Sequence, residues 1–140
     1  MTKEQILLHN NDSELLAKEA VKILIEKKGL DLRLYDVREN SPITDFYINV
    51  TGRSDNQVAA LADYLNDEIA ELGRSDARIE GKRGDSWILV DYRDLIVNIF
   101  NKESREFYNL DRLFPADSLV DITPEIAAVD AKMSGDKKTK

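Results

Sequence analysis

Cysteine is absent from this chain of 140 residues, and histidine occurs once, as His9. Without thiols there can be no disulfide bond, no thiol catalysis and no thiolate zinc site. A single histidine leaves little room for the acid–base and metal-binding roles of imidazole. His9 precedes the first expected helix and has no sequence neighbour that would make it a base. We therefore interpret it as a solvated residue.

Long apolar runs are also missing. No stretch approaches the roughly 20 apolar residues that span a bilayer. The chain begins Met1-Thr2-Lys3-Glu4-Gln5, without the basic segment, apolar stretch and small-residue cleavage site of an export signal. A chain of 140 residues with 42% hydrophobic content is expected to form one core. We therefore expect a single-domain, cytoplasmic protein that makes no contact with a membrane.

Positive charge is in deficit, because 20 lysines and arginines face 27 aspartates and glutamates, for a formal net charge of −7. This charge opposes sequence-independent attraction to phosphate backbones. We therefore expect no direct sequence-specific binding of nucleic acid. A basic protein is the better candidate for a partner.

Hydrophobic periodicity and turn residues define the expected elements. The predicted helices cover residues 12–28, 54–72 and 104–113, and the predicted strands cover residues 31–37, 45–51, 77–80, 86–91 and 94–100. The last two strands are expected to form a hairpin, and Phe107 and Leu110 are expected to pack the short third helix onto the fold. The interleaved order predicts an α/β class with a mixed sheet of about five strands flanked by helices.

The expected domain spans residues 12–122, after an N-terminal extension over residues 1–11. From about Pro124 the chain turns to Ala, Asp, Ser, Gly and Lys, a composition typical of disordered segments. Residues 123–140 are therefore predicted to form a disordered tail.

Three groups of residues invite an enzymatic interpretation, and each has a simpler alternative. The turn Thr51-Gly52-Arg53-Ser54 leads from a strand into a helix, where free amides and the helix dipole can hold a phosphate. One glycine and no following lysine make this pattern much weaker than a P-loop, and an ordinary capped helix explains it. Asp36, Asp45 and Asp55 lie near strand ends or a helix start, and turn formation and capping explain them equally well.

Asp91 and Asp94 form a carboxylate pair that resembles the metal ligands of nucleotidyl transferases. Side chains three positions apart in a strand point to opposite faces, unless a turn intervenes. A turn is expected near Arg93, so the pair is geometrically allowed without being supported. Ordinary turn and edge aspartates are the simpler interpretation.

The strand over residues 86–92 is apolar on both faces. Alternation places Trp87, Leu89 and Asp91 on one face and Ile88, Val90 and Tyr92 on the other. A central strand under helices has this pattern, yet only two long helices are predicted. Either the fold covers both faces, or a partner covers one and the only tryptophan of the chain anchors the interface. Both interpretations stay open at this point.

An ordered set of short motifs over roughly residues 13–122 resembles the ribosome silencing factors, also called Iojap-like proteins. The matching residues are Asp36-Val37-Arg38, Ser41, Thr44-Asp45-Phe46-Tyr47, Thr51-Gly52-Arg53-Ser54-Asp55, Gln57-Val58, Glu80-Gly81, Trp87-Ile88-Leu89-Val90-Asp91-Tyr92, Asp94, Ser104-Arg105-Glu106-Phe107-Tyr108, Leu110 and Leu113. No single motif is decisive, but their order over nearly the whole domain is specific.

The resemblance implies a non-catalytic translational repressor. Such a protein binds the large ribosomal subunit through its fourteenth ribosomal protein and sterically keeps the small subunit from joining. The family implies a nucleotidyltransferase-like fold without its active site, no cofactor or metal, and homodimers of the free protein. The binding positions carried over are Trp87, Leu89, Asp91 and Tyr92, together with Glu80 and Asp94.

Three positions depart from the family pattern. Arg93 stands where glycine is usual, Asn98 where histidine is usual, and Phe114 where tryptophan is more frequent. If the glycine position needs a positive φ, Arg93 adopts a left-handed conformation at a cost of about 1 kcal/mol. The alternatives to silencing are a metal-dependent nucleotidyltransferase or nucleotide-binding protein, a ribosome-assembly factor, and a homodimeric scaffold.

Overall fold

The computed structural model describes the backbone of residues 12–138 and the side chains of residues 12–134. His9 and the predicted extension over residues 1–11 lie outside this range. Within it, no helix is long and apolar enough to cross a membrane.

Five strands form one mixed sheet in the order β1-β2-β5-β4-β3. The strands are β1 (Leu30–Asp36), β2 (Phe46–Thr51), β3 (Arg78–Glu80), β4 (Trp87–Asp91) and β5 (Leu95–Phe100). β2 and β5 pair in parallel, and the other neighbours pair antiparallel. The predicted α/β class with a mixed five-stranded sheet is confirmed, and so is the β4–β5 hairpin.

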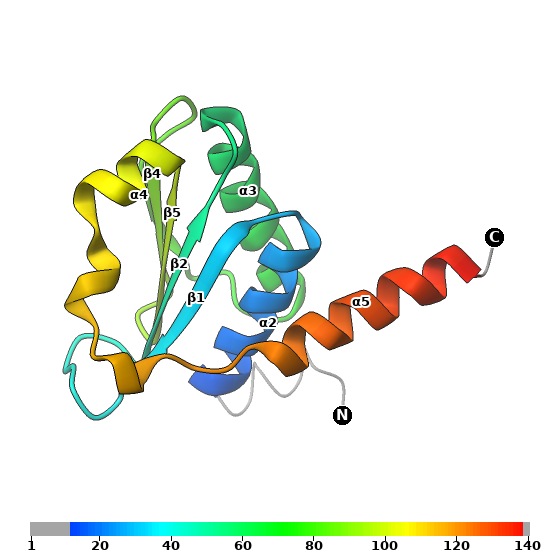
Figure 1. Ribbon diagram of the computed structural model, residues 1–140, viewed down its shortest axis with the longest axis horizontal. Helices are drawn as coiled ribbons and strands as arrows, with labels where there is room; N and C mark the ends of the chain where they lie inside the picture. Colours follow the sequence, from blue (N-terminus) through cyan, green and yellow to red (C-terminus); the bar gives the residue numbers. More distant parts are fainter. Residues whose placement is uncertain (1–11, 139–140) are drawn as a thin grey trace.

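Two long helices, α2 (Ser13–Glu26) and α3 (Asp55–Glu71), cover one face of the sheet (Figure 1). Each begins at an N-cap, where the side-chain oxygen of Asp12 or Ser54 accepts hydrogen bonds from backbone amides of the first turn. In a capping box the Gln57 side chain would bond back to the Ser54 amide. Here its Nε2 donates instead to the carbonyl of Lys27 at 2.9 Å. Apolar side chains of both helices and of the sheet form one core, which includes Leu16, Leu24, Ile48, Leu61, Leu65, Val90 and Val97.

Over the described residues, the opposite face is crossed by a short chain segment, which we call the cover segment (residues 102–118). It contains α4 (Lys102–Tyr108) and two short 3-10 helices, η1 (Leu110–Leu113) and η2 (Ala116–Ser118). Figure 1 shows it, yellow to orange, on the side of the sheet away from α2 and α3. Asn109 breaks the expected helix with φ 46°. Phe107 is 80% exposed, so the prediction that it packs onto the fold is wrong.

A helix replaces the disorder predicted for residues 123–140, since α5 covers Thr123–Lys138. Asp121 accepts a hydrogen bond from the Thr123 amide at 2.9 Å, and Pro124 is favourable in a first helical turn. Val129 is buried on the body of the protein, and Lys132 pairs with Glu26 of α2 at 3.3 Å. The prediction from composition was wrong because Ala and Lys have high helix propensity. The contacts of Asp121 and Val129 stabilise the helix further.

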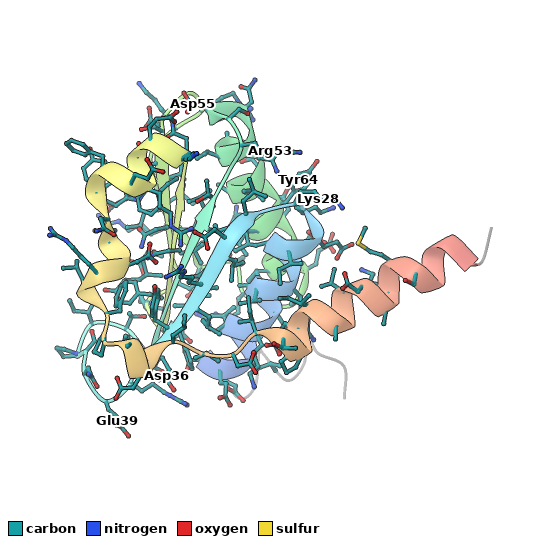
Figure 2. All side chains as sticks on the ribbon, in the orientation of Figure 1. Lys28, Asp36, Glu39, Arg53, Asp55 and Tyr64 are labelled. Carbon is teal, nitrogen blue, oxygen red and sulfur yellow. The ribbon has the colours of Figure 1, made fainter. Side chains whose placement is uncertain are left out.

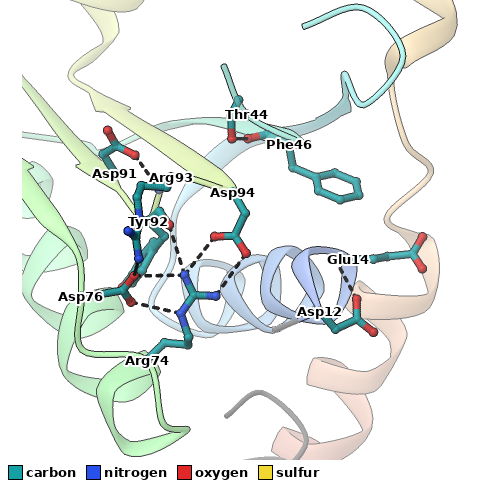
Figure 3. A network of polar contacts seen from close by, with 10 residues as sticks. All are labelled: Asp12, Glu14, Thr44, Phe46, Arg74, Asp76, Asp91, Tyr92, Arg93 and Asp94. Carbon is teal, nitrogen blue, oxygen red and sulfur yellow. Dashed lines mark hydrogen bonds and ion pairs between the residues drawn. The ribbon is translucent and has the colours of Figure 1, made fainter. Parts of the chain in front are cut away.

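The link between β4 and β5 is fastened by a charge network (Figure 3). Arg93 adopts φ 76°, and its amide donates to Oδ1 of Asp91 at 2.7 Å. Arg74 pairs with Asp94 at 2.9 Å and with Asp76 at 3.0 Å, and it donates to the Tyr92 carbonyl at 3.1 Å. The left-handed conformation expected for Arg93 is therefore present.

Replacing Arg93 by glycine should relieve this backbone strain. We expect Arg93→Gly to be more stable than Arg93→Ala by about 1 kcal/mol, because only glycine adopts a positive φ without steric cost. Both variants lose the ion pair with Asp76, in which Arg93 is 84% exposed, so this pair does not distinguish them. Urea unfolding at neutral pH measures the difference. Equal stability of the two variants would show that the turn is not strained.

Candidate functional site

The sheet face away from α2 and α3, which we call the open face, presents alternate residues of β4. Trp87, Leu89 and Asp91 are half-buried there, whereas Ile88 and Val90 are buried under the helices. The alternation predicted for this strand is confirmed.

A groove of about 400 Å³ lies between β4 and the cover segment on the open face. Its lining is mostly apolar, and we call it the open-face groove. It is lined by Val37, Asn40, Ser41, Tyr47, Trp87, Leu89, Ile96, Asn98, Leu110, Leu113, Phe114 and Pro115. Leu113 is 66% exposed at this groove, so an apolar surface is available beside Trp87.

Aromatic rings contact one another on both sides of the groove. On one side the Trp87 ring lies 5.0 Å from the ring of Phe100 and 4.8 Å from that of Tyr108. On the other, Phe114 lies 4.4 Å from Tyr35 and 4.9 Å from Tyr47. Such pairs stabilise beyond the area they bury, by about 0.5–1.5 kcal/mol each. The cover segment therefore packs at two aromatic clusters.

Between these clusters runs a chain of hydrogen bonds, which we call the polar relay (Trp87, Asn98, Asn49 and Asp111). Nε1 of Trp87 donates to Oδ1 of Asn98 at 3.1 Å, and Nδ2 of Asn98 donates to Oδ1 of Asn49 at 3.1 Å. Nδ2 of Asn49 then donates to Oδ1 of Asp111 at 3.0 Å. Asn49 and Asn98 are buried, so these bonds satisfy groups that would otherwise be costly to bury.

Asp111 is the only anion of the relay and joins it to the cover segment. Its carboxylate also accepts from the Tyr35 hydroxyl at 2.7 Å and pairs with Nε of Arg105 at 3.1 Å. Burial opposes ionisation of Asp111, but hydrogen bonds from Asn49, Arg105 and Tyr35 outweigh it and lower its pKa. Burial and Asp111 together raise the pKa of Tyr35 to about 12. Asp111 is thus a carboxylate at neutral pH.

Acidic side chains lie at the β3 side of the groove. A second hollow, of about 280 Å³, is lined by Glu80, Gly81, Trp87 and Leu89. Glu80 is exposed and Asp91 half-buried, so both carboxylates can meet an approaching partner. Four of the six sequence-predicted binding residues, Trp87, Leu89, Asp91 and Glu80, therefore share one side of the sheet.

The remaining two predicted residues, Tyr92 and Asp94, make their contacts within the protein. Tyr92 is 0% exposed, so the prediction that it contacts a partner is wrong; the strand alternation points its ring to the helix face, where burial raises the pKa of its hydroxyl. The Asp94 side chain is 18% exposed and faces Arg74 (Figure 3). Its contacts are those of a residue that fastens the hairpin.

The groups with an enzymatic alternative do not assemble. Asp91 bonds the Arg93 amide while Asp94 pairs with Arg74, so the two carboxylates have separate partners. Asp36 and Asp55 lie at opposite ends of the molecule (Figure 2). Among the described residues, no group of three or more His, Cys, Asp or Glu side chains is placed to hold a metal ion.

The turn at Gly52 is a close-packed helix start. The Gly52 amide donates to the Phe100 carbonyl at 2.7 Å, and a Cβ at this position would meet the Val58 amide nitrogen at 2.9 Å. Ser54 caps α3 by accepting from the Gln57 amide at 3.1 Å. The capped-helix interpretation accounts for these contacts.

Sequence reasoning missed two residues that connect the sides of the groove. Neither Asn49 nor Asp111 was assigned a role, because Asp111 meets Asn49 and Tyr35 across 62 and 76 residues of the chain. Phe114 was noted only as a departure from a family pattern. The signal available in the sequence was an asparagine in each of two predicted strands, Asn49 and Asn98.

Fold and groove together define a small single-domain α/β protein whose sheet is covered by helices on one face and carries an apolar groove on the other. The family model described as "Ribosomal silencing factor during starvation" matches residues 10–140. The chain belongs to this family, which consists of regulatory proteins rather than enzymes.

Individual relatives agree with this assignment. A "Ribosomal silencing factor RsfS" of Haemophilus influenzae is 42% identical over 87 residues, which cover 62% of this chain and 85% of the relative. The mouse protein "Mitochondrial assembly of ribosomal large subunit protein 1" is 31% identical over 77% of this chain, which spans 49% of that protein. A crystal structure of a Chromobacterium violaceum protein superposes with a TM-score of 0.70 at 29% identity, over 74% of this chain and 86% of that one.

Removing the Asp111 carboxylate tests its role in fastening the cover segment. We expect Asp111→Ala to lower the free energy of unfolding by about 3 kcal/mol, because Arg105, Asn49 and Tyr35 lose a shared acceptor. The control Asp117→Ala, at an exposed position of η2, should stay within about 0.5 kcal/mol of wild type. Urea unfolding at pH 7 measures both.

The difference in the free energy of unfolding between wild type and Asp111→Ala should depend on pH. Because the pKa of Asp111 is lowered on folding, its contribution is fully present above the unfolded pKa of about 3.9 and is lost as pH falls through the folded pKa. The difference between wild type and Asp111→Ala should therefore shrink below about pH 4. Equal losses for the Asp111 and Asp117 variants at pH 7 would contradict the assigned role.

Proposed function

We propose that this protein is a non-catalytic translational repressor that acts in the cytoplasm. It docks the open-face groove onto the large ribosomal subunit, through the fourteenth ribosomal protein of that subunit, and keeps the small subunit from joining. The observation that carries the proposal is the Trp87-centred apolar groove on the open face of a ribosomal silencing factor family member.

The groove has the composition of an interface core. Trp87 and Leu89 present apolar surface beside the exposed Leu113 and the half-buried Phe114. Tryptophan is enriched among the few residues that dominate binding energies, above all where surrounding side chains exclude water. Trp87 lies between the groove and the smaller hollow at Glu80, so a partner can enclose it on both sides.

The charge of the protein suits a basic partner. Glu80 and Asp91 border the apolar surface, in a chain with a net charge of −7. Complementary charge speeds encounter and selects among partners more than it adds affinity. Ribosomal proteins are mostly basic, and repulsion from ribosomal RNA disfavours misplaced contacts.

To block subunit joining sterically, the protein only has to stay bound where the two ribosomal subunits meet. A standard interface of about 1,600 Å² is enough to hold a protein of this size in place. We also propose that the free protein is a homodimer, since the exposed Leu113 and Ile43 are side chains that a second copy can bury. A role in assembling the large subunit is the second candidate, favoured by the name of the mouse relative.

Truncating the tryptophan tests the docking surface directly. We expect Trp87→Ala to lose cosedimentation with isolated large subunits and to lose inhibition of their reassociation with small subunits, because the anchor of the apolar surface is gone. The control is Tyr64→Ala, which removes a 46% exposed aromatic side chain from α3 on the helix-covered side. Circular dichroism first confirms that both variants are folded.

Three outcomes oppose the proposal. If folded Trp87→Ala binds large subunits as wild type does, the open face is not the docking surface. If wild type itself stays at the top of the gradient, the silencing function fails, and thermal shifts with nucleotide and magnesium test the transferase alternative. Binding without any effect on subunit joining would favour the assembly role.

A further inference from the structure

The polar relay connects the two sides of the open-face groove. One end is Trp87 on β4, whose Nε1 is bonded to Asn98 at 3.1 Å. The other end is Asp111 on η1, within the cover segment that contributes Leu110, Leu113 and Phe114 to the groove. The two amides between them come from the central strands β5 and β2.

The two ends of the relay impose one direction on it. An indole N–H can only donate, and an ionised carboxylate can only accept. Asn49 must therefore turn its NH2 toward Asp111, and Asn98 must turn its oxygen toward Trp87. Asn49 is 0% exposed and Asn98 2%, so water does not compete for these bonds. The charge of Asp111 thus determines the amide orientation that Trp87 meets.

Apolar side chains could fill the space that Asn49 and Asn98 occupy in the polar relay. Leucine has the branched shape and the heavy-atom count of asparagine, is larger by volume and carries no polar group. Replacing both partners of a buried polar pair by apolar groups of the same shape is often nearly neutral. A role in stability and a role in positioning therefore predict different behaviour for the same substitutions.

We propose that Asn98, Asn49 and Asp111 are positioning residues for partner docking. They hold the Trp87 indole with Nε1 turned inward, and they fix the cover segment at a set distance from it. The groove is thereby formed before a partner arrives, and the partner does not have to order either side. The docking step rests on the proposed function, whereas the hold on Trp87 is a property of the free protein.

The test compares wild type with the double variant Asn49→Leu/Asn98→Leu. Trp87 is the only tryptophan, so a single indole N–H signal in the NMR spectrum reports on its bond. We expect the variant to stay folded, to exchange this proton with solvent at least about tenfold faster, and to bind large subunits about tenfold more weakly. Asn56→Leu, at an exposed position of α3, is the matched control and should change neither rate nor affinity.

A conservative variant keeps the test decisive if the double variant does not fold. A neutral imidazole has one acceptor and one donor nitrogen, as the relay requires. At pH 8 we therefore expect Asn98→His to preserve slow indole exchange and binding, and Asn98→Leu to lose both. Equal behaviour of these two variants would overturn the proposal.

Each readout has its own contrary result. Unchanged indole exchange in a folded double variant shows that the relay does not hold Trp87. Fast exchange with unchanged affinity shows that the hold has no part in docking. If wild type does not bind large subunits at all, the proposed function fails, and the indole rates still decide whether the relay positions Trp87.

Discussion

A sheet with apolar side chains on both faces, and long helices for only one of them, is the constraint on which the rest of the structure depends. β4 and β5 present large side chains to each side, and α2 and α3 bury the inner set in one core. The outer set is left to the short cover segment, which packs at two aromatic clusters and leaves a groove of about 400 Å³ between them. The groove thus follows from the way this fold is covered, and its apolar lining is what a partner can bury.

Buried charge and buried amides give this thinly covered face a defined shape. Asp111 collects hydrogen bonds from two strands and an ion pair from Arg105, and it ties η1 to the sheet. A buried ion pair adds little net stability over apolar packing, but it allows few alternative arrangements. At the hairpin, Arg74 has the corresponding role by joining Asp76 and Asp94. Both networks fix positions beside the groove that we propose as the docking surface.

The sequence was sufficient for those features that depend on local patterning. Strand alternation placed Trp87 and Tyr92 on opposite faces, and Tyr92 was misassigned to the binding surface only when the family pattern was carried over whole. The left-handed Arg93 followed from the glycine that the family pattern usually places at this position. Long-range contacts had no such signal: Asp111 meets Asn49 across 62 residues, and α5 packs on the body of the protein through the buried Val129 and the ion pair of Lys132 with Glu26. Composition alone does not register either contact.

Hydrogen–deuterium exchange of the protein, free and bound to isolated large subunits, tests the central claim most directly, because it maps the docked surface without any substitution. The account predicts that protection on binding is confined to β3, β4, residues 37–41 and the cover segment, which border the open-face groove and the smaller hollow at Glu80. The exposed helix surfaces of α2 and α3 should exchange as in the free protein. Protection centred on α2 and α3, with β4 and residues 102–118 unchanged, would contradict it.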